Sequence, residues 1–395
     1  MKFFSPIFFL SLSSSFSFFS EPSLPSHKWS LNDNNDNDCI RTNDDLTPSR
    51  IGVVGVPLRY GQNKDGPQLG PKALRGPLFE AMNRAGCSYQ DNGDLEFQQS
   101  YELGESHDMY DGHNFGTETH SSFACQGIQN NSGCGNAMFP KTVASAVYRI
   151  ESAVSRVSSA GQFALTLGGD HAMVMATVEA TGSVYKDLVV IHIDAHGDIN
   201  TIKSSESGHI HGAPLSFVVE DEQFQSENAD CVPFKSILPV IKPSNLAFIG
   251  LRDLDPFEVQ SIERLNITAF TSSAVRELGA KEIVKRVFDA VNPDRKKPVH
   301  VSFDIDSVDP LYAPSTGTSV TNGLTKDDAI EIAKEISRTG TLVALDIAEV
   351  NPMIRSEEAS MTVQTAVDVS MAFLSEVCPN NPNGLKSGRR RNASC

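Results

Sequence analysis

The sequence predicts an α/β domain in which helices flank a mostly parallel sheet. Short apolar runs alternate with longer segments of helical periodicity from about residue 51 to residue 377. Such alternation is typical of parallel strands joined by helices. Ionisable residues follow several of the apolar runs, and ligands of such sheets bind at the carboxyl ends of the strands. The pattern therefore predicts both a fold class and the edge of the sheet where a site would lie.

Each short, largely apolar run is an expected strand, because strands of a parallel sheet are buried on both faces. The expected strands are residues 51–56, 163–167, 188–193, 246–249, 299–303 and 342–347. The expected helices are residues 142–159, a segment from about Met173, a segment near 214–219, and residues 256–265, 280–291, 326–338 and 362–377. Residues 97–140 interrupt the alternation with three histidines, two cysteines and little periodicity. We expect a long surface loop there, with a second metal site as the alternative.

The two ends of the chain differ from this pattern. Residues 1–20 form an apolar stretch rich in Phe, Leu and Ser with one charge, Lys2, as in a secretory signal peptide; a disordered extension is the alternative. Residues 21–48 contain Asn-Asp repeats that cannot bury a core, and residues 379–395 are typical of a flexible tail. The folded domain is therefore expected over residues 49–378, and its location stays open between the secretory pathway and the cytoplasm.

Composition narrows the range of partners. The hydrophobic content of 39% is enough for a substantial core, and the net charge of −16 argues against nucleic acid. An acidic surface instead favours a cationic small molecule. No membrane partner is expected, because the apolar start is short and rich in serine. Among the seven cysteines, Cys125 and Cys134 lie in one polar loop and predict a disulfide, while Cys87 is expected to be a packed thiol.

Two motifs at expected strand ends carry the strongest chemical signal. Asp194-Ala195-His196-Gly197-Asp198 follows one apolar run, and Asp304-Ile305-Asp306 follows another. Alternate residues of an extended segment point the same way, so the ionisable side chains of each motif converge. Burying these five groups without a cation would be costly. The two motifs therefore predict a metal site.

Four further segments lie just past expected strands or on the loop that follows. They are Gly168-Gly169-Asp170-His171, His209-Ile210-His211-Gly212, Gly250-Leu251-Arg252-Asp253-Leu254-Asp255 and Asp346-Ile347-Ala348-Glu349-Val350-Asn351-Pro352. Within and beside these motifs, Asp170, Asp253 and His300 are expected to be structural. His192 is expected to be a packed strand histidine.

Together with Gly55-Val56-Pro57, Gly61-Gln62 and Asn92-Gly93-Asp94-Leu95, these motifs resemble the arginases of the ureohydrolase family over residues 50–377. The resemblance implies a three-layer α/β/α sandwich around an eight-stranded, mostly parallel sheet, with two Mn²⁺ ions per chain. It assigns His171, Asp194, Asp198 and Asp304 to one ion, and Asp194, His196, Asp304 and Asp306 to the other. A site rich in carboxylates and without thiolates suits Mn²⁺ better than structural zinc.

The function implied is hydrolysis of L-arginine to L-ornithine and urea, by attack of a metal-bridging hydroxide on the guanidinium carbon. In this scheme Asp198 hydrogen-bonds the nucleophile, and Glu349 pairs with the guanidinium. His211 shuttles protons, and Thr318 supports the nucleophile or the guanidinium. An agmatinase or another guanidino-compound ureohydrolase is the alternative. A catalytically silent arginine-binding relative is the alternative of another class.

The choice of substrate depends on the side chains that contact the α-amino and α-carboxylate groups of arginine. Asn200, Ser205 and Ser207 can donate hydrogen bonds to an α-carboxylate. Asp255 can accept from an α-ammonium, with Glu258 one helical turn further on as its partner. Agmatine has no carboxylate, so a site built this way favours arginine.

Two departures from the family pattern accompany this expectation. His209 replaces the small amide residue usual at that position in animal arginases. A homotrimer is expected by resemblance, yet Lys326-Asp327-Asp328 lacks the Arg-Glu pair that links subunits of some relatives.

Overall fold

The computed structural model describes residues 48, 50–97 and 133–378, all of which belong to one compact unit. The expected leader and tail, residues 21–47 of the polar segment and residues 98–132 of the expected loop lie outside the described residues. No helix in the described part of the chain is long and apolar enough to cross a membrane.

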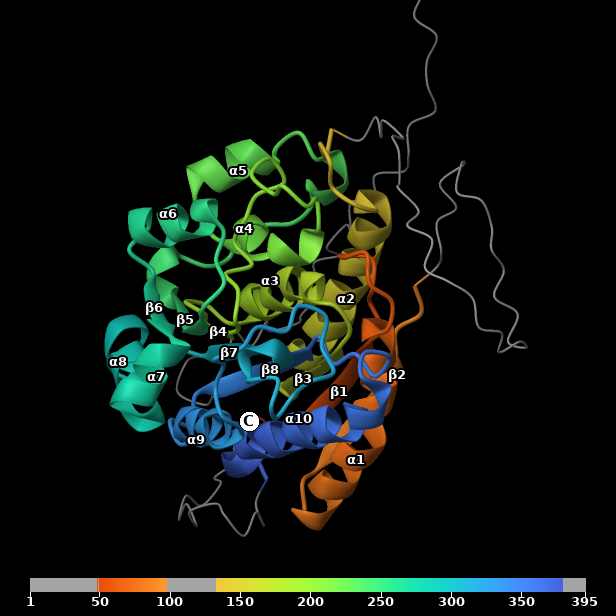
Figure 1. The fold of residues 1–395 in the computed structure, drawn as a ribbon, viewed down its shortest axis with the longest axis vertical. Helices are drawn as coiled ribbons and strands as arrows, with labels where there is room; N and C mark the ends of the chain where they lie inside the picture. Colours follow the sequence, from red (N-terminus) through yellow and green to blue (C-terminus); the bar gives the residue numbers. More distant parts are fainter. Residues whose placement is uncertain (1–47, 49, 98–132, 379–395) are drawn as a thin grey trace, which may run out of the picture. The chain divides into compact units, whose positions relative to one another are not determined.

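The described residues form one sheet of eight strands in the order β2-β1-β3-β8-β7-β4-β5-β6 (Figure 1). The strands are β1 Ile51–Val56, β2 Tyr89–Asp94, β3 Phe163–Gly168, β4 Val189–Ile193, β5 Leu246–Leu251, β6 Thr268–Thr271, β7 Val299–Asp304 and β8 Leu342–Ala348. Every neighbouring pair is parallel. All carboxyl ends therefore meet one edge, which confirms the expected fold class.

Helices cover both faces of the sheet (Figure 1). One layer contains α1 Gly70–Arg84, α7 Ser272–Leu278, α8 Ala280–Val291, α9 Lys326–Ser337 and α10 Ala359–Phe373. The other contains α2 Pro140–Ser159, α3 Val174–Val184, α4 Leu215–Val218, α5 Glu222–Asn228 and α6 Pro256–Arg264. Each layer buries its own apolar cluster against one face of the sheet, as in a three-layer sandwich.

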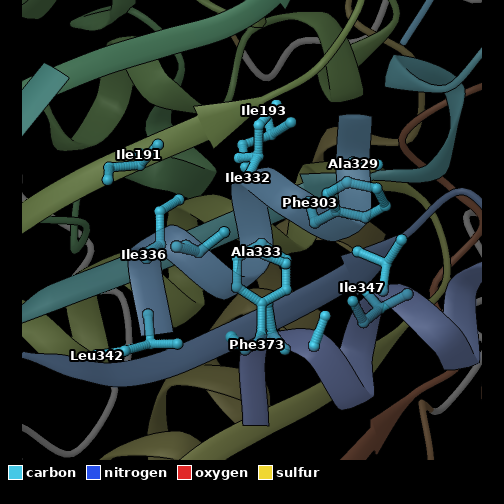
Figure 2. Close-up of a cluster of buried hydrophobic side chains, with 14 of the residues drawn as sticks. Ile191, Ile193, Phe303, Ala329, Ile332, Ala333, Ile336, Leu342, Ile347 and Phe373 are labelled. Carbon is cyan, nitrogen blue, oxygen red and sulfur yellow. The ribbon is translucent and has the colours of Figure 1, made fainter. Parts of the chain in front are cut away.

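The core between α9, α10 and the sheet supports two strands that carry site residues (Figure 2). Ile332 and Ile336, one helical turn apart on α9, pack in the same cluster as Phe303 of β7 and Ile347 of β8. The ring of Phe303 meets that of Phe373 of α10 edge-on, with centroids 6.1 Å apart. Full burial of a side chain of this size contributes about 1.5–3 kcal/mol. The ends of β7 and β8 are thus held rigidly.

The structure adds elements that the sequence pattern did not predict. Strand β2 is polar and largely exposed at one edge of the sheet, and β6 is a short edge strand with exposed positions, so neither has a buried apolar run. Helix α1 contains Pro71 and Pro77, and the second lies inside the helix, where proline normally interrupts helical structure. The short helices α5 and α7, seven residues each, were also missed.

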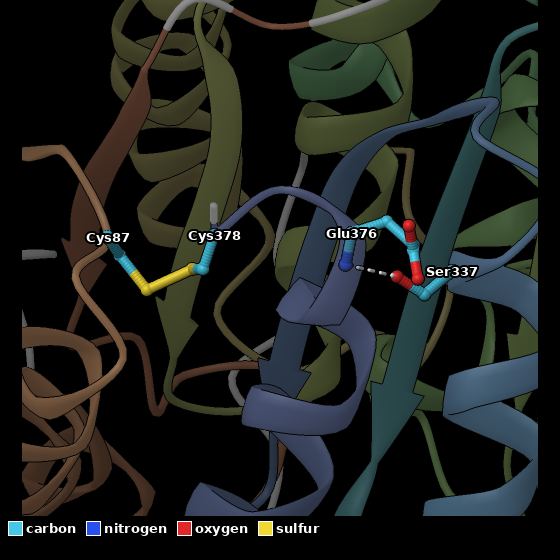
Figure 3. The surroundings of a disulfide bond; sticks show 4 residues. All are labelled: Cys87, Ser337, Glu376 and Cys378. Atoms are coloured by element: carbon cyan, nitrogen blue, oxygen red, sulfur yellow. Dashed lines mark hydrogen bonds between the residues drawn. A yellow bond between two sulfur atoms is a disulfide. The ribbon is translucent and has the colours of Figure 1, made fainter. Parts of the chain in front are cut away.

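Both expectations about cysteines are wrong. Cys134 is bonded to Cys231 and not to Cys125, and Cys87 forms a disulfide with Cys378 (Figure 3). The reason is topological. Helices α1 and α10 belong to the same layer. The segment after α1, with Cys87, therefore lies beside the segment after α10, with Cys378, although the two cysteines are 291 residues apart.

The Cys87–Cys378 bond is expected to contribute substantially to stability. Replacing both residues by Ala should lower the free energy of unfolding by about 2–4 kcal/mol, because the bond closes a long loop in the unfolded chain. Urea denaturation of the wild type and of the double variant measures the difference. An unchanged denaturation midpoint would show that this bond does not constrain the unfolded chain.

Candidate metal centre

Three carboxylates surround one ring nitrogen of His171, the first residue of a short helix that follows β3. Nδ1 of His171 lies 2.9 Å from Oδ2 of Asp194 and 2.8 Å from Oδ2 of Asp198. The third carboxylate oxygen, Oδ2 of Asp304, is 3.1 Å away. All four side chains are buried, and neither Nδ1 of His171 nor Oδ2 of Asp194 has a hydrogen-bond partner of suitable geometry among the described residues. Buried polar atoms that converge without partners fit a metal ion.

A second donor group shares Asp194. Its Oδ1 atom lies 3.3 Å from Nδ1 of His196, and Oδ2 of Asp306 lies 3.3 Å from the same nitrogen. Asp194 thus presents one oxygen to each donor group. The arrangement fits two neighbouring cations that share a carboxylate. The structure brings together all six side chains that the family resemblance assigned as ligands, namely His171, Asp194, His196, Asp198, Asp304 and Asp306.

The electrostatics of the cluster also fit cations. Burial would lower the pKa of His171, but the close carboxylates of Asp194, Asp198 and Asp304 outweigh burial and raise that pKa well above its usual value of 6.5. Burial would raise the pKa of Asp194, but the neighbouring histidines hold it well below its usual value. At Asp304, burial together with Asp306 and Asp194 raises the pKa well above its usual range. The raised pKa of Asp304 reflects repulsion between neighbouring buried carboxylates, and bound cations would relieve that repulsion.

His192 does more than the expected packed strand histidine. It is buried in β4, and its ring stacks on that of His171 with centroids 4.7 Å apart. Its Nε2 atom also lies 3.1 Å from Oδ2 of Asp194, close enough to belong to the donor group around His171. The alternation of a strand explains this position, because residues 192 and 194 point to the same side.

Other side chains hold the ligands in place. The Oγ atom of Ser302 lies 2.8 Å from Nε2 of His171, which orients the ring. The hydroxyl of Thr318 donates to Oδ2 of Asp306 at 2.8 Å, and Nη2 of Arg252 donates to the backbone carbonyl of Asp306 at 2.6 Å. Thr318 therefore contacts a ligand of the second donor group. The sequence had not predicted roles for Ser302 or Arg252.

Glu349, just past β8, is the centre of a buried hydrogen-bond network. Its Oε1 accepts from the backbone N–H of His171 at 2.9 Å and lies 3.0 Å from Nδ1 of His211. Nε2 of Gln62 lies 2.8 Å from each oxygen. Burial would raise the pKa of Glu349, but these partners, His211 first, outweigh burial and lower it; the same contact raises the pKa of His211 against burial. Gln62 had no predicted role, and its only sequence signal was the Gly61-Gln62 motif.

Two of the functional residues have left-handed backbone conformations. Asp198 has φ of 50° and Glu349 has φ of 60°. Such conformations cost a non-glycine residue about 1–3 kcal/mol and persist where the surroundings hold them. Here the N–H of Leu215 donates to the carbonyl of Asp198 at 3.0 Å, and the N–H of Glu349 donates to the carbonyl of Gly169 at 2.8 Å. The strain places both carboxylates at the site.

Two of the three residues expected to be structural are so. Asp170 accepts hydrogen bonds from the backbone N–H groups of Gly61 at 2.8 Å and Ala172 at 3.0 Å. Burial and the charge of Glu349 raise its pKa to about 6. Nε2 of His300 pairs with a buried Asp346 at 2.8 Å. Asp253 instead lies on the wall of the site cavity, with its carboxylate 3.8 Å from Nε2 of His196.

A cavity opens over the donor groups. Its lining residues are His196, Asp198, Asn200, His211, Gly212, Asp253, Leu254, Asp255, Glu258, Asp304 and Thr318. Residues 199–208, which we call the substrate loop after the role expected from the sequence, contribute Asn200 to this lining. Nδ2 of Asn200 donates to Oδ2 of Asp255 at 2.8 Å, and Glu258 accepts from the backbone N–H of Asp255 at 3.0 Å. Burial and the charge of Asp198 are among the causes that raise the pKa of Glu258 to about 8.

The two predicted serines occupy a different place. The Oγ atom of Ser205 accepts from the N–H of Gly208 at 3.1 Å, and Oγ of Ser207 accepts from the N–H of His209 at 3.2 Å. Both hydroxyls thus stabilise turns in or next to the substrate loop. Among the described residues that line the cavity, Asn200 comes from this loop, whereas Ser205 and Ser207 do not appear.

A parallel α/β sheet with a buried carboxylate–histidine cluster at its carboxyl edge defines a metal-binding α/β enzyme. The sequence profile of the arginase family matches residues 49–375. The chain therefore belongs to the arginase family, a family of hydrolases.

Individual relatives agree with this assignment. The chain is 38% identical to the mitochondrial arginase-2 of Rattus norvegicus over 81% of this chain and 83% of that protein. It is 34% identical to arginase-1 of Homo sapiens over 82% and 92%, respectively. The solved structure of the arginase from Bacillus caldovelox superposes with a TM-score of 0.67 at 28% identity, covering 83% of this chain and 98% of that one.

Proposed function

We propose that this chain hydrolyses L-arginine to L-ornithine and urea with two Mn²⁺ ions. The observation that carries the proposal is the position of Asp194, which faces His171 with one oxygen and His196 with the other. It lies next to a cavity that His196, Asp198 and Asp304 line. Membership of the arginase family supports the reaction. Hard oxygen donors without thiolates support manganese.

Two sets of residues would hold the ions. They are His171, Asp194, Asp198 and Asp304 for one ion, and Asp194, His196, Asp304 and Asp306 for the other. When bound, the ions supply positive charge that acidifies an attacking water and stabilises the charge developed during attack.

The remaining steps fall to the side chains of the chain itself. The carboxylate of Glu349 binds the cationic guanidinium, and its lowered pKa keeps it ionised at neutral pH. The water oxygen bonds to the guanidinium carbon, and the bond from that carbon to the ornithine nitrogen breaks. Asp198 accepts one proton of the water and passes it to the leaving amine. The other proton of the water is lost as the urea carbonyl forms, and His211 supplies the second proton that makes the ornithine amine an ammonium group. His211, part-buried between Glu349 and the cavity, exchanges protons with solvent.

Urea release tests the proposal directly. The full chain, purified and incubated with Mn²⁺, should release urea and L-ornithine in equal amounts from L-arginine. Removal of the metal by a chelator should stop the reaction, and Mn²⁺ should restore it. Metal-loaded protein that binds L-arginine without releasing urea would support the silent-relative alternative.

The preference for arginine over agmatine is expected to be large. We predict a kcat/KM for L-arginine at least ~10²-fold above that for agmatine, because agmatine lacks the carboxylate and several charge-assisted hydrogen bonds are lost. Parallel urea assays with both substrates give the ratio. Equal efficiency would show that Asn200 and its loop do not read a carboxylate, and the agmatinase alternative would replace the arginase proposal.

A substitution at Asp255 tests the other charged group at the α-carbon. Asp255→Asn removes the charge and keeps an oxygen at the start of α6. Loss of one charge-assisted hydrogen bond should raise the KM for L-arginine roughly tenfold and leave metal content unchanged. An unchanged KM would exclude Asp255 as the partner of the α-ammonium group.

We further propose a homotrimer. Family resemblance supports it, as does exposed apolar surface beside α10. Leu311 is 77% exposed, and the carbonyl of its neighbour Tyr312 accepts from Thr365 of that helix at 2.8 Å. Met361 on the same helix is also exposed. Residues 326–328 are Lys-Asp-Asp, and Asp328 caps α9 through Thr325. Any trimer therefore uses contacts other than an Arg-Glu pair at this segment. The mass by light scattering tests the assembly.

We also propose that the chain folds in an oxidising compartment. Disulfides are rare in reducing compartments, and the described residues form two of them, Cys87–Cys378 and Cys134–Cys231, each between buried or half-buried cysteines. The apolar stretch at residues 1–20 agrees with entry into the secretory pathway. Intact-mass spectrometry of the protein from its native source tests both points. A retained leader with all thiols reduced would place the protein in the cytoplasm.

A further inference from the structure

A segment that precedes α2 holds the substrate loop from one side. We call residues 134–138 the clamp segment. Nδ2 of Asn136 donates hydrogen bonds to the backbone carbonyls of Ser205 at 3.2 Å and Glu206 at 3.0 Å. One exposed amide thus fixes two consecutive peptide groups of the loop.

Backbone contacts bring the clamp segment still closer to the loop. The N–H of Met138 donates to the carbonyl of Gly208 at 2.9 Å. Gly208 has φ of 72°, and a Cβ atom there would lie 2.1 Å from the carbonyl oxygen of Asn136. Only glycine fits at this contact, so the two backbones touch directly.

The end of α5 holds the first half of the substrate loop from the other side. Oδ1 of Asn228 accepts from the backbone N–H of Ile202 at 2.8 Å. A carboxylate oxygen of Glu227 accepts from the hydroxyl of Thr201 at 2.7 Å. Two segments that lie far apart in the sequence therefore hold the loop: the end of α5 bonds its first half and the clamp segment bonds its second half.

The Cys134–Cys231 disulfide joins the clamp segment covalently to the chain just past α5. Cys134 belongs to the clamp segment, and Cys231 follows Asn228 by one turn, with its N–H bonded to the Asn228 carbonyl at 3.0 Å. Both cysteines are buried. The chain next to the bond is equally close, because a Cβ atom on Gly133 would lie 1.9 Å from the carbonyl of Asp230.

Asn200 of the substrate loop lines the cavity, whereas Asp198, an expected metal ligand just before the loop, is anchored by other contacts. Asn200 lies on the cavity wall and donates to Asp255. Asp198 is held by the N–H of Leu215 and faces His171, and neither contact involves the clamp segment. The N–H of Asn200 donates to the carbonyl of Gly212 at 3.2 Å, but its side chain is tied to the loop by the Ser204 hydroxyl, which donates to Oδ1 at 3.2 Å. Loosening the clamp segment should therefore displace the Asn200 side chain and leave the donor groups in place.

We propose that the disulfide, together with Asn136, positions the substrate loop and thereby sets the affinity for the α-amino and α-carboxylate end of the substrate. This inference rests on the proposed function for its choice of substrate. Asn136, Cys134 and Cys231 act as positioning residues: they act on the substrate through Asn200 and touch none of the reacting atoms.

Three variants test the proposal in the metal-loaded full chain. Asn136→Ala removes two hydrogen bonds from an exposed residue and keeps the disulfide. The double variant Cys134→Ala/Cys231→Ala removes the disulfide. The double variant Cys87→Ala/Cys378→Ala is the matched control, because it removes a disulfide that does not contact the loop. Kinetics on L-arginine and agmatine are combined with hydrogen exchange of the amides at residues 199–208.

In the two clamp variants, the KM for L-arginine should rise roughly three- to tenfold, the effect of one or two lost hydrogen bonds. The value of kcat and the efficiency on agmatine should stay within about twofold, and the loop amides should exchange faster. The control should lower stability and leave the KM and loop exchange unchanged.

Two results would overturn the proposal. One is an unchanged KM and unchanged loop exchange in Asn136→Ala. This variant is expected to fold, because Asn136 is exposed. The other is a loss of kcat/KM in the clamp variants that is equal for L-arginine and agmatine, or equal to the loss in the Cys87→Ala/Cys378→Ala control. Either outcome would indicate general destabilisation. Absence of urea release by the wild type would instead refute the proposed function, and hydrogen exchange would still decide whether the clamp holds the loop.

Discussion

Asp194→Asn is expected to abolish metal binding and urea release together. Asp194 is the carboxylate that faces both donor groups, through Oδ2 toward His171 and Oδ1 toward His196. The substitution removes its negative charge and replaces one carboxylate oxygen by an NH2 group, whose nitrogen cannot bind a cation. Because both ions are affected, activity should fall by more than the ~10²–10³-fold typical for loss of one electrostatic group in an active site.

Metal analysis and urea assays on the same preparation make this result decisive. The control is Asp289→Asn, which removes the same charge from an exposed position on α8 and should keep both metals and full activity. A folded Asp194→Asn variant with two bound Mn²⁺ per chain would show that the donor groups are not the metal site. Loss of one metal with the other retained would show that Asp194 does not bridge.

The parts of the fold that depend on buried strands could be predicted from the sequence. The runs at residues 299–303 and 342–347 are mostly apolar, with His300, Ser302 and Asp346 as their polar members, and the structure places β7 and β8 there with every position buried. The polar residues that end such runs lie at one edge of a parallel sheet by geometry alone. For this reason the sequence pattern places Asp304 and Glu349 at that edge, while their expected roles come from the family resemblance. The edge strands β2 and β6 have no comparable signal, because only one of their sides is paired.

The contacts between distant segments could not be predicted in the same way. Local composition suggested a bond between Cys125 and Cys134, but Cys134 pairs with Cys231, which is 97 residues away. Gln62 reaches Glu349 from 287 residues away, and Asn136 reaches the substrate loop from a segment without periodicity. Each contact depends on which helices and loops share a layer or an edge, and that order is a property of the folded sheet.

His211→Ala is expected to slow turnover strongly and to leave the metals in place. Nδ1 of His211 lies 3.0 Å from Oε1 of Glu349 and 3.3 Å from Nε2 of Gln62, and the ring lines the cavity beside the donor groups. Its raised pKa favours the protonated form, which can supply a proton to the leaving amine. Loss of a general acid costs about 10²–10⁴-fold in rate, which should appear in kcat.

His209→Ala is the matched control, because its ring lies 5.7 Å from that of His211. Burial, together with the charges of His211 and Lys64, lowers the pKa of His209, so it is neutral at the pH where His211 is charged. It is therefore a poor proton donor, and its removal should leave kcat within about threefold of the wild type, far from the loss expected of a general acid. Metal loss in His211→Ala would make His211 a ligand. An equal fall of kcat in both variants would exclude a specific proton shuttle at His211.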